Sequence, residues 1–398
     1  MELNLKANWY AAAEGIHTRV VAHRRHLHAH PELSFAEHAT SDYVAASLQK
    51  IGIEFTRGWC KSDGGAGIVA EIHGQASSTS RHIALRADLD ALPICELPGP
   101  SYISQNEGAM HACGHDAHTA CLLGAAELLH NSRSQWSGTV RLIFQPGEER
   151  LPGGASIMAA EGALDSATSI AAQHVYPELR AGQLGFRSGP YMAATDEIYI
   201  TVQSPGGHGA LPQTAPDPIV AAAHLILALQ SVVSRMRDPL SPGVLTIGKI
   251  QGGQAGNVIP SEVKLAGTLR SYDESWRDRA HADIERIAQA TCSAHGTTAQ
   301  VELKRGYPAV VNDPDLTARC RAIAVNLVGE KNVVDLPQRM TGEDFSFYQR
   351  LIPGCFYRLG TGGDDPRTRS GLHTPGFDID EKALITGTAM LAALGAGL

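Results

Sequence analysis

The sequence predicts an α/β protein in which a compact β-α-β-β-α-β domain is inserted into a larger domain of alternating strands and helices. Three observations predict this fold class. The chain has 398 residues, more than one core usually serves, so two domains are expected. Short apolar runs alternate with helix-like stretches in the first half. This alternation changes in the middle of the chain and resumes near the C-terminus.

The larger domain is predicted from short β-branched or apolar runs that suit buried parallel strands. The predicted strands of the first half are Gly67–Ile72, His82–Ala87, Thr139–Phe144 and Ser169–Gln173. Helix-like segments lie between them at Ala36–Lys50 and His115–His130. Near the C-terminus we expect a helix at Pro314–Val328, a strand at Cys355–Leu359 and a helix at Asp380–Leu394.

The inserted domain is predicted at residues 190–306, which leaves residues 1–189 and 307–398 to the larger domain. Turn-like residues mark both boundaries, Gly189-Pro190 and Gly306-Tyr307-Pro308. Between them we predict, in order, Glu197–Gln203 (strand), Pro218–Met236 (helix), Val244–Ile250 and Val263–Leu269 (strands), Ser275–His295 (helix) and Ala299–Leu303 (strand). This order is the ferredoxin-like arrangement, a four-stranded sheet covered on one face by two helices.

Composition and charge exclude several classes of partner. The chain is 43% hydrophobic and 19% charged, as in globular proteins, and its net charge of −8 gives no electrostatic reason to expect nucleic acid or a membrane. The longest apolar run, Ile219–Val233, is interrupted and too short to span a bilayer. Its apolar face suits a subunit interface, and burial in the core is the simpler alternative.

The cysteines favour a reducing compartment. There are seven, an odd number, with no repeated spacing, which is not the pattern of a disulfide framework. The first twenty residues place Lys6, Glu14 and His17 where a signal peptide requires an unbroken apolar stretch. We therefore expect a cytoplasmic protein.

Polar residues follow several predicted strands, where ligands bind in open α/β sheets. They are Asp88 and Asp90, then Glu148 and Glu149, then His174 after the strand ending at Gln173. Cys113 and His115 stand at the start of a predicted helix, where free amides and the helix dipole favour a thiolate.

Each residue alone has a simpler structural explanation. Cys113 suits burial as a small apolar group, the Glu148-Glu149 pair suits a solvated turn, and His174 suits a hydrogen-bonded core position. Together, thiolate, imidazole and carboxylate groups are ligands for a borderline divalent metal, and two ions need several of each. A metal lowers the pKa of a bound water and polarises a carbonyl, while an adjacent glutamate serves as general base.

Seven motifs in order along the chain resemble those of a known family. They are Asp-Leu-Asp-Ala-Leu-Pro at 88–93, Met-His-Ala-Cys-Gly-His-Asp-Ala-His-Thr-Ala at 110–120, Phe-Gln-Pro-Gly-Glu-Glu at 144–149, Gly-Gly-His-Gly-Ala at 206–210, Gly-Asn-Val-Ile-Pro at 256–260, Thr-Gly-Glu-Asp-Phe-Ser at 341–346 and Leu-His-Thr-Pro-Gly-Phe at 372–377. The match begins at Arg24-Arg25. It resembles the metal-dependent amidohydrolase/peptidase family of hippurate hydrolases, auxin-conjugate (IAA-amino acid) hydrolases and N-acyl-L-amino acid amidohydrolases. Gly147 stands where many relatives have alanine, which leaves loop geometry and substrate preference open.

The resemblance implies a di-metal α/β peptidase domain with an inserted lid and dimerisation domain. The implied ligands of two divalent ions are Cys113, His115, Glu149, His174 and His373, with Glu148 as general base. The ions are expected to be Mn²⁺ or Zn²⁺, with Ni²⁺ or Co²⁺ as alternatives, and to share the cysteine. We expect Asp88 and Asp90 to orient ligands by hydrogen bonds rather than to bind metal.

The resemblance also assigns residues of the inserted domain. It implies that His208 stabilises the oxyanion, across the interface of a homodimer or dimer-based oligomer, and that Asn257 and Arg270 bind the substrate carboxylate. A turn histidine and a surface ion pair are the simpler alternatives for His208 and Arg270.

The sequence therefore predicts a metallo-amidohydrolase that acts on linear amides. Its expected substrates are small N-acyl or aminoacyl amino acids, from which it releases a free amino acid through a metal-activated water and Glu148. A dipeptidase or carboxypeptidase with the same machinery is the alternative. A non-catalytic metal-binding protein is disfavoured because Glu148 remains beside the ligands.

Overall fold

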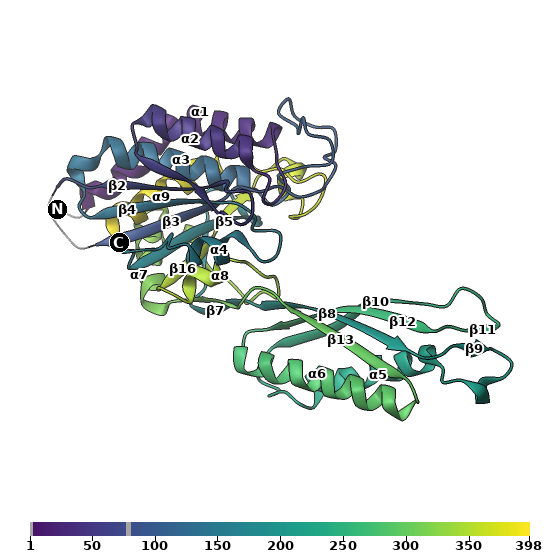
Figure 1. Cartoon of the computed structure of the whole chain (residues 1–398). Coiled ribbons are helices and arrows are strands. Elements are labelled where there is room, and N and C mark those ends of the chain that lie inside the picture. Colours follow the sequence, from purple (N-terminus) through teal and green to yellow (C-terminus); the bar gives the residue numbers. More distant parts are fainter. Residues whose placement is uncertain (1–2, 77–80) are drawn as a thin grey trace. The chain divides into compact units, whose positions relative to one another are not determined.

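The chain forms two compact units (Figure 1), and a computed structural model describes residues 3–76 and 81–398 of it. The larger unit contains the chain up to Gly189 together with Val311–Pro337 and Asp344–Leu398. The smaller unit contains Pro190–Val310 and Gln338–Glu343. Both units combine helices with sheet, so the predicted α/β class is confirmed.

The larger unit is built on an eight-stranded mixed sheet of strand order β1-β2-β4-β3-β5-β16-β6-β15. Its strands are β1 (Phe55–Trp59), β2 (Gly67–His73), β3 (His82–Asp88), β4 (Thr139–Gln145), β5 (Ser169–Arg180), β6 (Leu184–Phe186), β15 (Val333–Asp335) and β16 (Gly354–Gly362). The central strands β4, β3, β5 and β16 run parallel, so their carboxyl ends lie at one edge.

The expectation that Gly67–Ile72 is a parallel strand is wrong. β2 pairs antiparallel with both β1 and β4. An apolar run does not disclose the direction of a strand. The connection from His73 to His82 is also too short for the crossover of a dozen or more residues that parallel strands require.

Helices cover the sheet of the larger unit. They are α1 (Leu3–Ala29), α2 (His38–Ile51), α3 (His115–Asn131), α4 (Gly154–Ala160), α7 (Pro314–Val328), α8 (Ser346–Gln349) and α9 (Ala383–Gly397), with 3₁₀ turns at Arg133–Gln135, Glu330–Asn332 and Pro366–Arg369. α3 packs against α1, α9 and β3. It is buried along almost its whole length, because it carries Ala, Leu, Cys and Gly on nearly every side. This packing fixes the start of α3 at the carboxyl edge of the sheet.

The smaller unit has its own sheet and core. Its main elements are, in order, β8 (Ala194–Gln203), α5 (Pro218–Ser234), β10 (Gly243–Gly252), β12 (Glu262–Ser271), α6 (Glu274–Ala294) and β13 (Thr298–Arg305). The strands form an antiparallel sheet of order β10-β12-β8-β13. Asp217 and Asp273 accept backbone hydrogen bonds at the starts of α5 and α6, which fixes where both helices begin.

Shorter elements complete the fold. β9 (Gly207–His208) pairs with β11 (Val258–Ile259), β7 (Gly189–Met192) pairs with β14 (Val310–Asn312), and a 3₁₀ turn covers Pro212–Thr214.

The boundary predicted at Gly306-Tyr307-Pro308 is wrong in detail. The smaller unit extends to Val310 and also includes Gln338–Glu343, which the prediction gave to the larger domain. Ala193 donates its amide hydrogen to the carbonyl oxygens of Arg339 and Thr341, and the Tyr272 hydroxyl donates to the Arg339 carbonyl at 2.6 Å. A loop that returns through backbone hydrogen bonds leaves no composition signal in the sequence.

The apolar run predicted around Ile219–Val233 forms α5, and it presents apolar side chains on two sides. Ala221, Leu225 and Leu229 lie in the core of the smaller unit, whereas Val220 and Leu227 are exposed, Leu227 by 71%. Across residues 3–76 and 81–398, none of the helices combines the length and the apolar character needed to cross a membrane.

Candidate metal centre

The candidate centre lies where α3 begins, and a glycine makes its geometry possible. Gly114 precedes His115 with a φ of 80°, in the left-handed region. A Cβ atom there would lie 2.4 Å from Cγ2 of Val175. Because glycine has no Cβ, the chain turns tightly beside β5 and brings both Cys113 and His115 into the same buried group.

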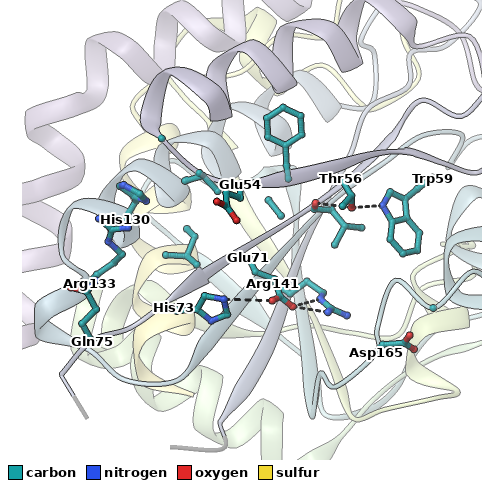
Figure 2. Close-up of a pocket in the computed structure, with 17 residues that line it drawn as sticks. Glu54, Thr56, Trp59, Glu71, His73, Gln75, His130, Arg133, Arg141 and Asp165 are labelled. Atoms are coloured by element: carbon teal, nitrogen blue, oxygen red, sulfur yellow. Dashed lines mark hydrogen bonds and ion pairs between the residues drawn. The ribbon is translucent and has the colours of Figure 1, made fainter. Parts of the chain in front are cut away.

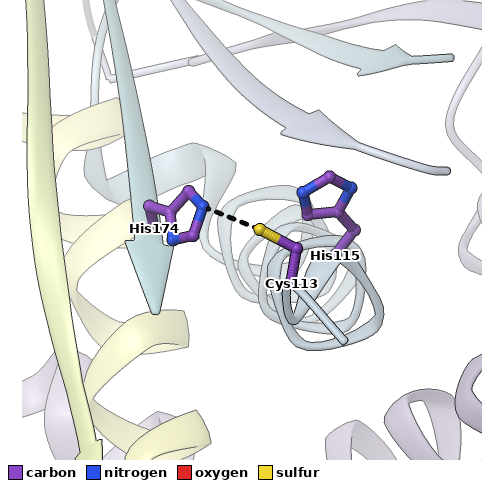
Figure 3. Close-up of side chains that lie close together, drawn as sticks. All are labelled: Cys113, His115 and His174. Atoms are coloured by element: carbon purple, nitrogen blue, oxygen red, sulfur yellow. Dashed lines mark hydrogen bonds between the residues drawn. The ribbon is translucent and has the colours of Figure 1, made fainter. Parts of the chain in front are cut away.

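Cys113, His115 and His174 form the first group of side chains (Figure 3). The Nε2 atom of His174 lies 3.4 Å from Sγ of Cys113, and its Nδ1 faces the Val175 carbonyl oxygen at 2.8 Å. His174 does not follow a strand end as expected. It lies within β5, because pairing with β16 continues the strand to Arg180, beyond the point where β3 ends.

Cys113, Glu149 and His373 form the second group. The Nε2 atom of His373 lies 3.3 Å from Sγ of Cys113 and 3.2 Å from Oε1 of Glu149. His373 has a φ of 61°, an uncommon conformation for a non-glycine residue, and its amide donates to the Ala112 carbonyl at 2.9 Å. The two groups share Cys113, so the five predicted ligands converge although the chain separates Cys113 from His373 by 260 positions.

Glu148 lies beside this centre. One carboxylate oxygen of Glu148, one of Glu149 and a ring nitrogen of His115 all lie within 4.8 Å of one another. The Asp344 amide donates to Oε1 of Glu148 at 3.4 Å. The preceding Gly147 has a φ of 64°, and a Cβ there would lie 2.3 Å from the ring of Phe35, so the packing of Phe35 accounts for the glycine.

Asp88 and Asp90 contact the imidazole rings of His118 and His115. Oδ1 of Asp90 lies 3.2 Å from Nδ1 of His115, and Oδ2 of Asp90 accepts the Glu149 amide hydrogen at 2.9 Å. Asp88 accepts from Arg86 at 2.6 Å and contacts Nδ1 of His118 at 2.6 Å. Oδ2 of Asp88 also lies 3.7 Å from Nε2 of His115. Asp90 therefore engages Nδ1 of His115, and Nε2 faces the carboxylates of Asp88 and Glu149.

At Cys113 the surroundings oppose the thiolate that the start of the helix was expected to favour. Burial, followed by the charges of Glu149 and Glu148, raises the pKa of Cys113 well above its usual range. Burial lowers the pKa of His115, but Asp88 and Asp90 outweigh it and raise that pKa to about 10. Burial, followed by Arg358, lowers the pKa of His174. Four carboxylates, those of Asp88, Asp90, Glu148 and Glu149, thus act on the site, and bound cations would offset their charge.

The residues present fit divalent ions. Nε2 of His115 and Oε1 of Glu149 are buried and make no hydrogen bond of good geometry among residues 3–76 and 81–398, although Asp88 lies 3.7 Å from the first and His373 lies 3.2 Å from the second. Buried polar atoms that lack hydrogen bonds are costly, and bound metal ions would satisfy these two atoms. A thiol, three imidazoles and a carboxylate match the ligand preferences of borderline divalent metals.

The residues predicted from the inserted domain lie in the smaller unit. His208 and Asn257 are exposed neighbours, since β9 pairs with β11 and the Gly209 amide donates to the Asn257 carbonyl at 2.9 Å. Arg270 is partly buried and donates to the backbone carbonyls of Leu269 and Asp196 at 3.1 and 3.4 Å. Register places Arg270 opposite Thr195, at the other end of the β8–β12 pair from β9 and β11. His208 and Arg270 are therefore roughly 25 Å or more apart within this unit.

Sequence reasoning missed His118. It is buried, Oδ1 of Asp88 lies beside its Nδ1, and its Nε2 accepts the Val175 amide hydrogen at 2.9 Å. One signal was available, because His115 and His118 are three residues apart on a predicted helix and therefore share a face.

A separate groove of about 700 Å³ lies against β1 and β2 (Figure 2). In it Glu71 lies between His73 and Arg141, and the Arg141 guanidinium donates to Glu71 at 2.6 Å. None of the residues predicted for the site lines this groove. The groove is therefore distinct from the candidate metal centre.

Comparison with known proteins agrees with this site. Residues 84–396 match Peptidase family M20/M25/M40. A probable hydrolase of Synechocystis is 40% identical over 96% of this chain and 95% of its own length. An N-acetyl-L-cysteine deacetylase of Bacillus subtilis is 39% identical over 94% and 86%. A solved Bacillus subtilis structure, described as a dinuclear metal-binding peptidase from the M20 family, is 34% identical, covers 96% of this chain and 98% of its own, and has a TM-score of 0.82. The family resemblance drawn from the motifs is confirmed.

Proposed function

This chain belongs to peptidase family M20/M25/M40, and on that premise we propose that it is a metal-dependent amidohydrolase that releases a free amino acid from an N-acyl or aminoacyl amino acid. One observation carries the proposal. Five potential ligands from four distant segments form two groups that share Cys113, and a further carboxylate, Glu148, lies within reach of them.

The residues divide into ligands, a base and groups that orient both. Cys113, His115, Glu149, His174 and His373 would hold two divalent ions, and Asp90 and Asp88 would orient His115. Bound ions would polarise the amide carbonyl and lower the pKa of water. Glu148 takes the proton of the attacking water and passes it to the leaving nitrogen, and the Asp344 amide holds its carboxylate in place.

We propose Mn²⁺ or Zn²⁺ as the ions, with Ni²⁺ or Co²⁺ as alternatives. The sulfur and imidazole ligands suit zinc, while the carboxylate of Glu149 also suits manganese. Metal analysis of the purified protein decides between them.

We propose a homodimer, formed through the smaller unit, which would also serve as a lid. β10 is an edge strand of its sheet, and it packs beside α5, whose Val220 and Leu227 are exposed. Unpaired strand edges and exposed apolar side chains are features of interfaces. Size-exclusion chromatography with light scattering should report a dimer for the parent and a monomer for Leu227→Glu.

We propose that His208 stabilises the oxyanion and that Asn257 and Arg270 bind the substrate carboxylate. A small substrate cannot bridge the roughly 25 Å between His208 and Arg270 within one unit. If both act on the same substrate, they come from two copies of the chain. This requirement supports the proposed dimer. Mixing His208→Ala with Arg270→Ala protein should then restore part of the activity that each variant lacks.

We also propose a cytoplasmic location. All seven cysteines are free thiols, as expected in a reducing compartment.

The test of function is a substrate panel with metal-loaded protein. N-acetyl, N-benzoyl and indole-acyl amino acids are assayed beside dipeptides, with release of the free amino acid as the measurement. We expect turnover of acyl amino acids that chelators abolish and metal restores. Preference for dipeptides would instead establish the dipeptidase alternative, and no turnover of either class would overturn the proposal.

A further inference from the structure

A fully buried arginine lies behind the metal centre. Arg24, on α1, has no exposed surface. Its Nε donates to Asp116 at 2.8 Å, its Nη2 donates to Asp378 at 2.7 Å, and its Nη1 lies 3.4 Å from Glu381. Its guanidinium carbon also lies 4.8 Å from the ring centre of Tyr102. Burying a charge is costly unless it is paired, and here every nitrogen of the guanidinium faces a carboxylate.

Two partners of Arg24, Asp116 and Asp378, lie in segments that carry proposed metal ligands. Asp116 directly follows His115 in the first turn of α3. Asp378 lies in the segment that follows His373, where it also accepts the Tyr102 hydroxyl at 3.1 Å and the Ile379 amide. The chain separates Arg24 from Asp116 by 92 positions and from Asp378 by 354. The Arg24 side chain thus joins the start of α3 to the segment that follows His373.

The His373 segment needs such a restraint. His373 is the most exposed of the five proposed ligands, with 53% of its side chain accessible, and it has a left-handed φ of 61°. The His373 amide donates to the Ala112 carbonyl. An uncommon backbone conformation persists when surrounding contacts determine it.

Arginine has the geometry for this task, and lysine does not. The planar guanidinium presents donors in fixed directions, so one group can hold two carboxylates at a set separation. A lysine ammonium would keep the charge and lose the fork. His28 supports the same cluster, since its Nδ1 lies 2.8 Å from Asp116 and its Nε2 lies 3.0 Å from Glu96.

We propose that Arg24 is a positioning residue for the metal centre, which ties the α3 start carrying Cys113 and His115 to the segment carrying His373. It contacts none of the proposed ligands. Its effect is on the ion held by Cys113, Glu149 and His373, rather than on the ion held by Cys113, His115 and His174. This inference rests on the ligand assignment proposed above.

The smaller unit offers a matched control. Arg277 is also buried, and its Nε donates to Asp196 at 2.9 Å while its Nη1 pairs with Glu274 at 3.0 Å. Both of these partners lie in the smaller unit, which contains no proposed metal ligand. Loss of Arg277 should lower stability much as loss of Arg24 does, without changing metal affinity.

The experiment compares Arg24→Lys, Arg24→Met and Asp378→Asn with Arg277→Lys in the full chain. Zinc affinity and stoichiometry are measured by competition with a chromophoric chelator, at a temperature where circular dichroism shows each variant folded. We expect one of two zinc ions to bind at least tenfold more weakly in Arg24→Met and Asp378→Asn, with Arg24→Lys intermediate or equal to Arg24→Met. Arg277→Lys should retain both affinities.

Asp378→Asn removes one charged partner of Arg24, so it allows the same test if Arg24→Met does not fold. Two parent affinities that remain unchanged in the folded Arg24 or Asp378 variants would overturn the inference. Equal weakening in Arg277→Lys would also overturn it, because the effect would then be one of general stability. The proposed function fails separately if the parent chain does not bind two ions, or if His373→Ala leaves both affinities unchanged.

Discussion

The larger and the smaller unit each bury an arginine among carboxylates, but the carboxylates around the first arginine come from more distant parts of the chain. Arg24 pairs with residues 92 and 354 positions away, whereas Arg277 pairs with Asp196, 81 positions away, and with Glu274 in its own helix. The difference extends to the proposed functional residues. Those of the larger unit are mostly buried and converge from distant segments, while His208 and Asn257 of the smaller unit are exposed on short strands.

This comparison suggests a division of roles. Chemistry that needs several ligands within a few ångströms depends on long-range packing, so the larger unit is where substitutions should affect metal binding and turnover. The smaller unit exposes the polar side chains of His208 and Asn257 and the apolar side chain of Leu227. Such exposure is expected for a surface that meets a substrate or a second copy of the chain.

Glu148→Gln should lower kcat on the order of 10²–10⁴-fold, because glutamine has nearly the same shape but cannot accept the proton of the attacking water. Steady-state kinetics on the best acyl amino acid measures this loss. Metal content should not change. The matched control is Glu262→Gln in the smaller unit, an exposed residue paired with Lys264 at 3.0 Å, which should leave kcat unaltered. A Glu148→Gln protein with undiminished kcat would remove Glu148 from the mechanism.

Cys113→Ala should weaken the binding of both ions, whereas His174→Ala and His373→Ala should each weaken mainly one. The reason is that Cys113 belongs to both ligand groups and each histidine belongs to one. Loss of a single ligand should reduce affinity by at least tenfold. Metal content after dialysis against a limiting chelator, measured by plasma emission, checks the expectation. If Cys113→Ala keeps two tightly bound ions, the shared-ligand arrangement is wrong.

Much of this arrangement could be predicted from the sequence, and the parts that could not have physical causes. β3, β4 and α3 follow from apolar patterning, and the types of residue around Cys113 indicate a metal site. The direction of β2 depends on the length of a connection, and the extension of β5 past His174 depends on pairing with β16. His373 and the Arg24 cluster depend on contacts across more than 250 positions, which no local pattern encodes.

His111 should lower the stability of the larger unit as the pH falls from about 6.5 to 4. Burial lowers the pKa of His111 from 6.5 to about 4, and neither ring nitrogen has a partner among residues 3–76 and 81–398. The unfolded chain therefore binds a proton in this range that the folded chain does not, so the free energy of unfolding falls as the pH falls. His111→Leu should remove on the order of 3 kcal/mol of this dependence.

Asp196 supplies the contrast in the smaller unit. Burial raises its pKa, but hydrogen bonds from Arg277 and His281 lower it more, to well below its usual value. Its contribution to stability is present above the ordinary aspartate pKa and is lost only as the pH falls below about 4. Urea unfolding at several pH values, followed by circular dichroism, separates the two windows. A parent and a His111→Leu protein with identical pH profiles would contradict the assignment to His111.

Lys304→Ala should change the free energy of unfolding by less than about 0.5 kcal/mol. Lys304 lies 3.7 Å from Glu302 on the exposed face of β13, and half of its side chain is accessible, so solvent screens the pair. Urea unfolding at low and high salt measures the effect. A loss of several kcal/mol would show that the smaller unit depends on this surface charge, contrary to the comparison drawn above.

Anomalous diffraction from crystals of the metal-loaded protein would show whether two ions bind and whether they share Cys113. Data collected on both sides of the metal absorption edge locate the ions without assumptions about ligands. We expect two ions in the larger unit, with Sγ of Cys113 bound to both, His115 and His174 on one, and Glu149 and His373 on the other. A single ion, or two ions that do not share Cys113, would contradict this expectation.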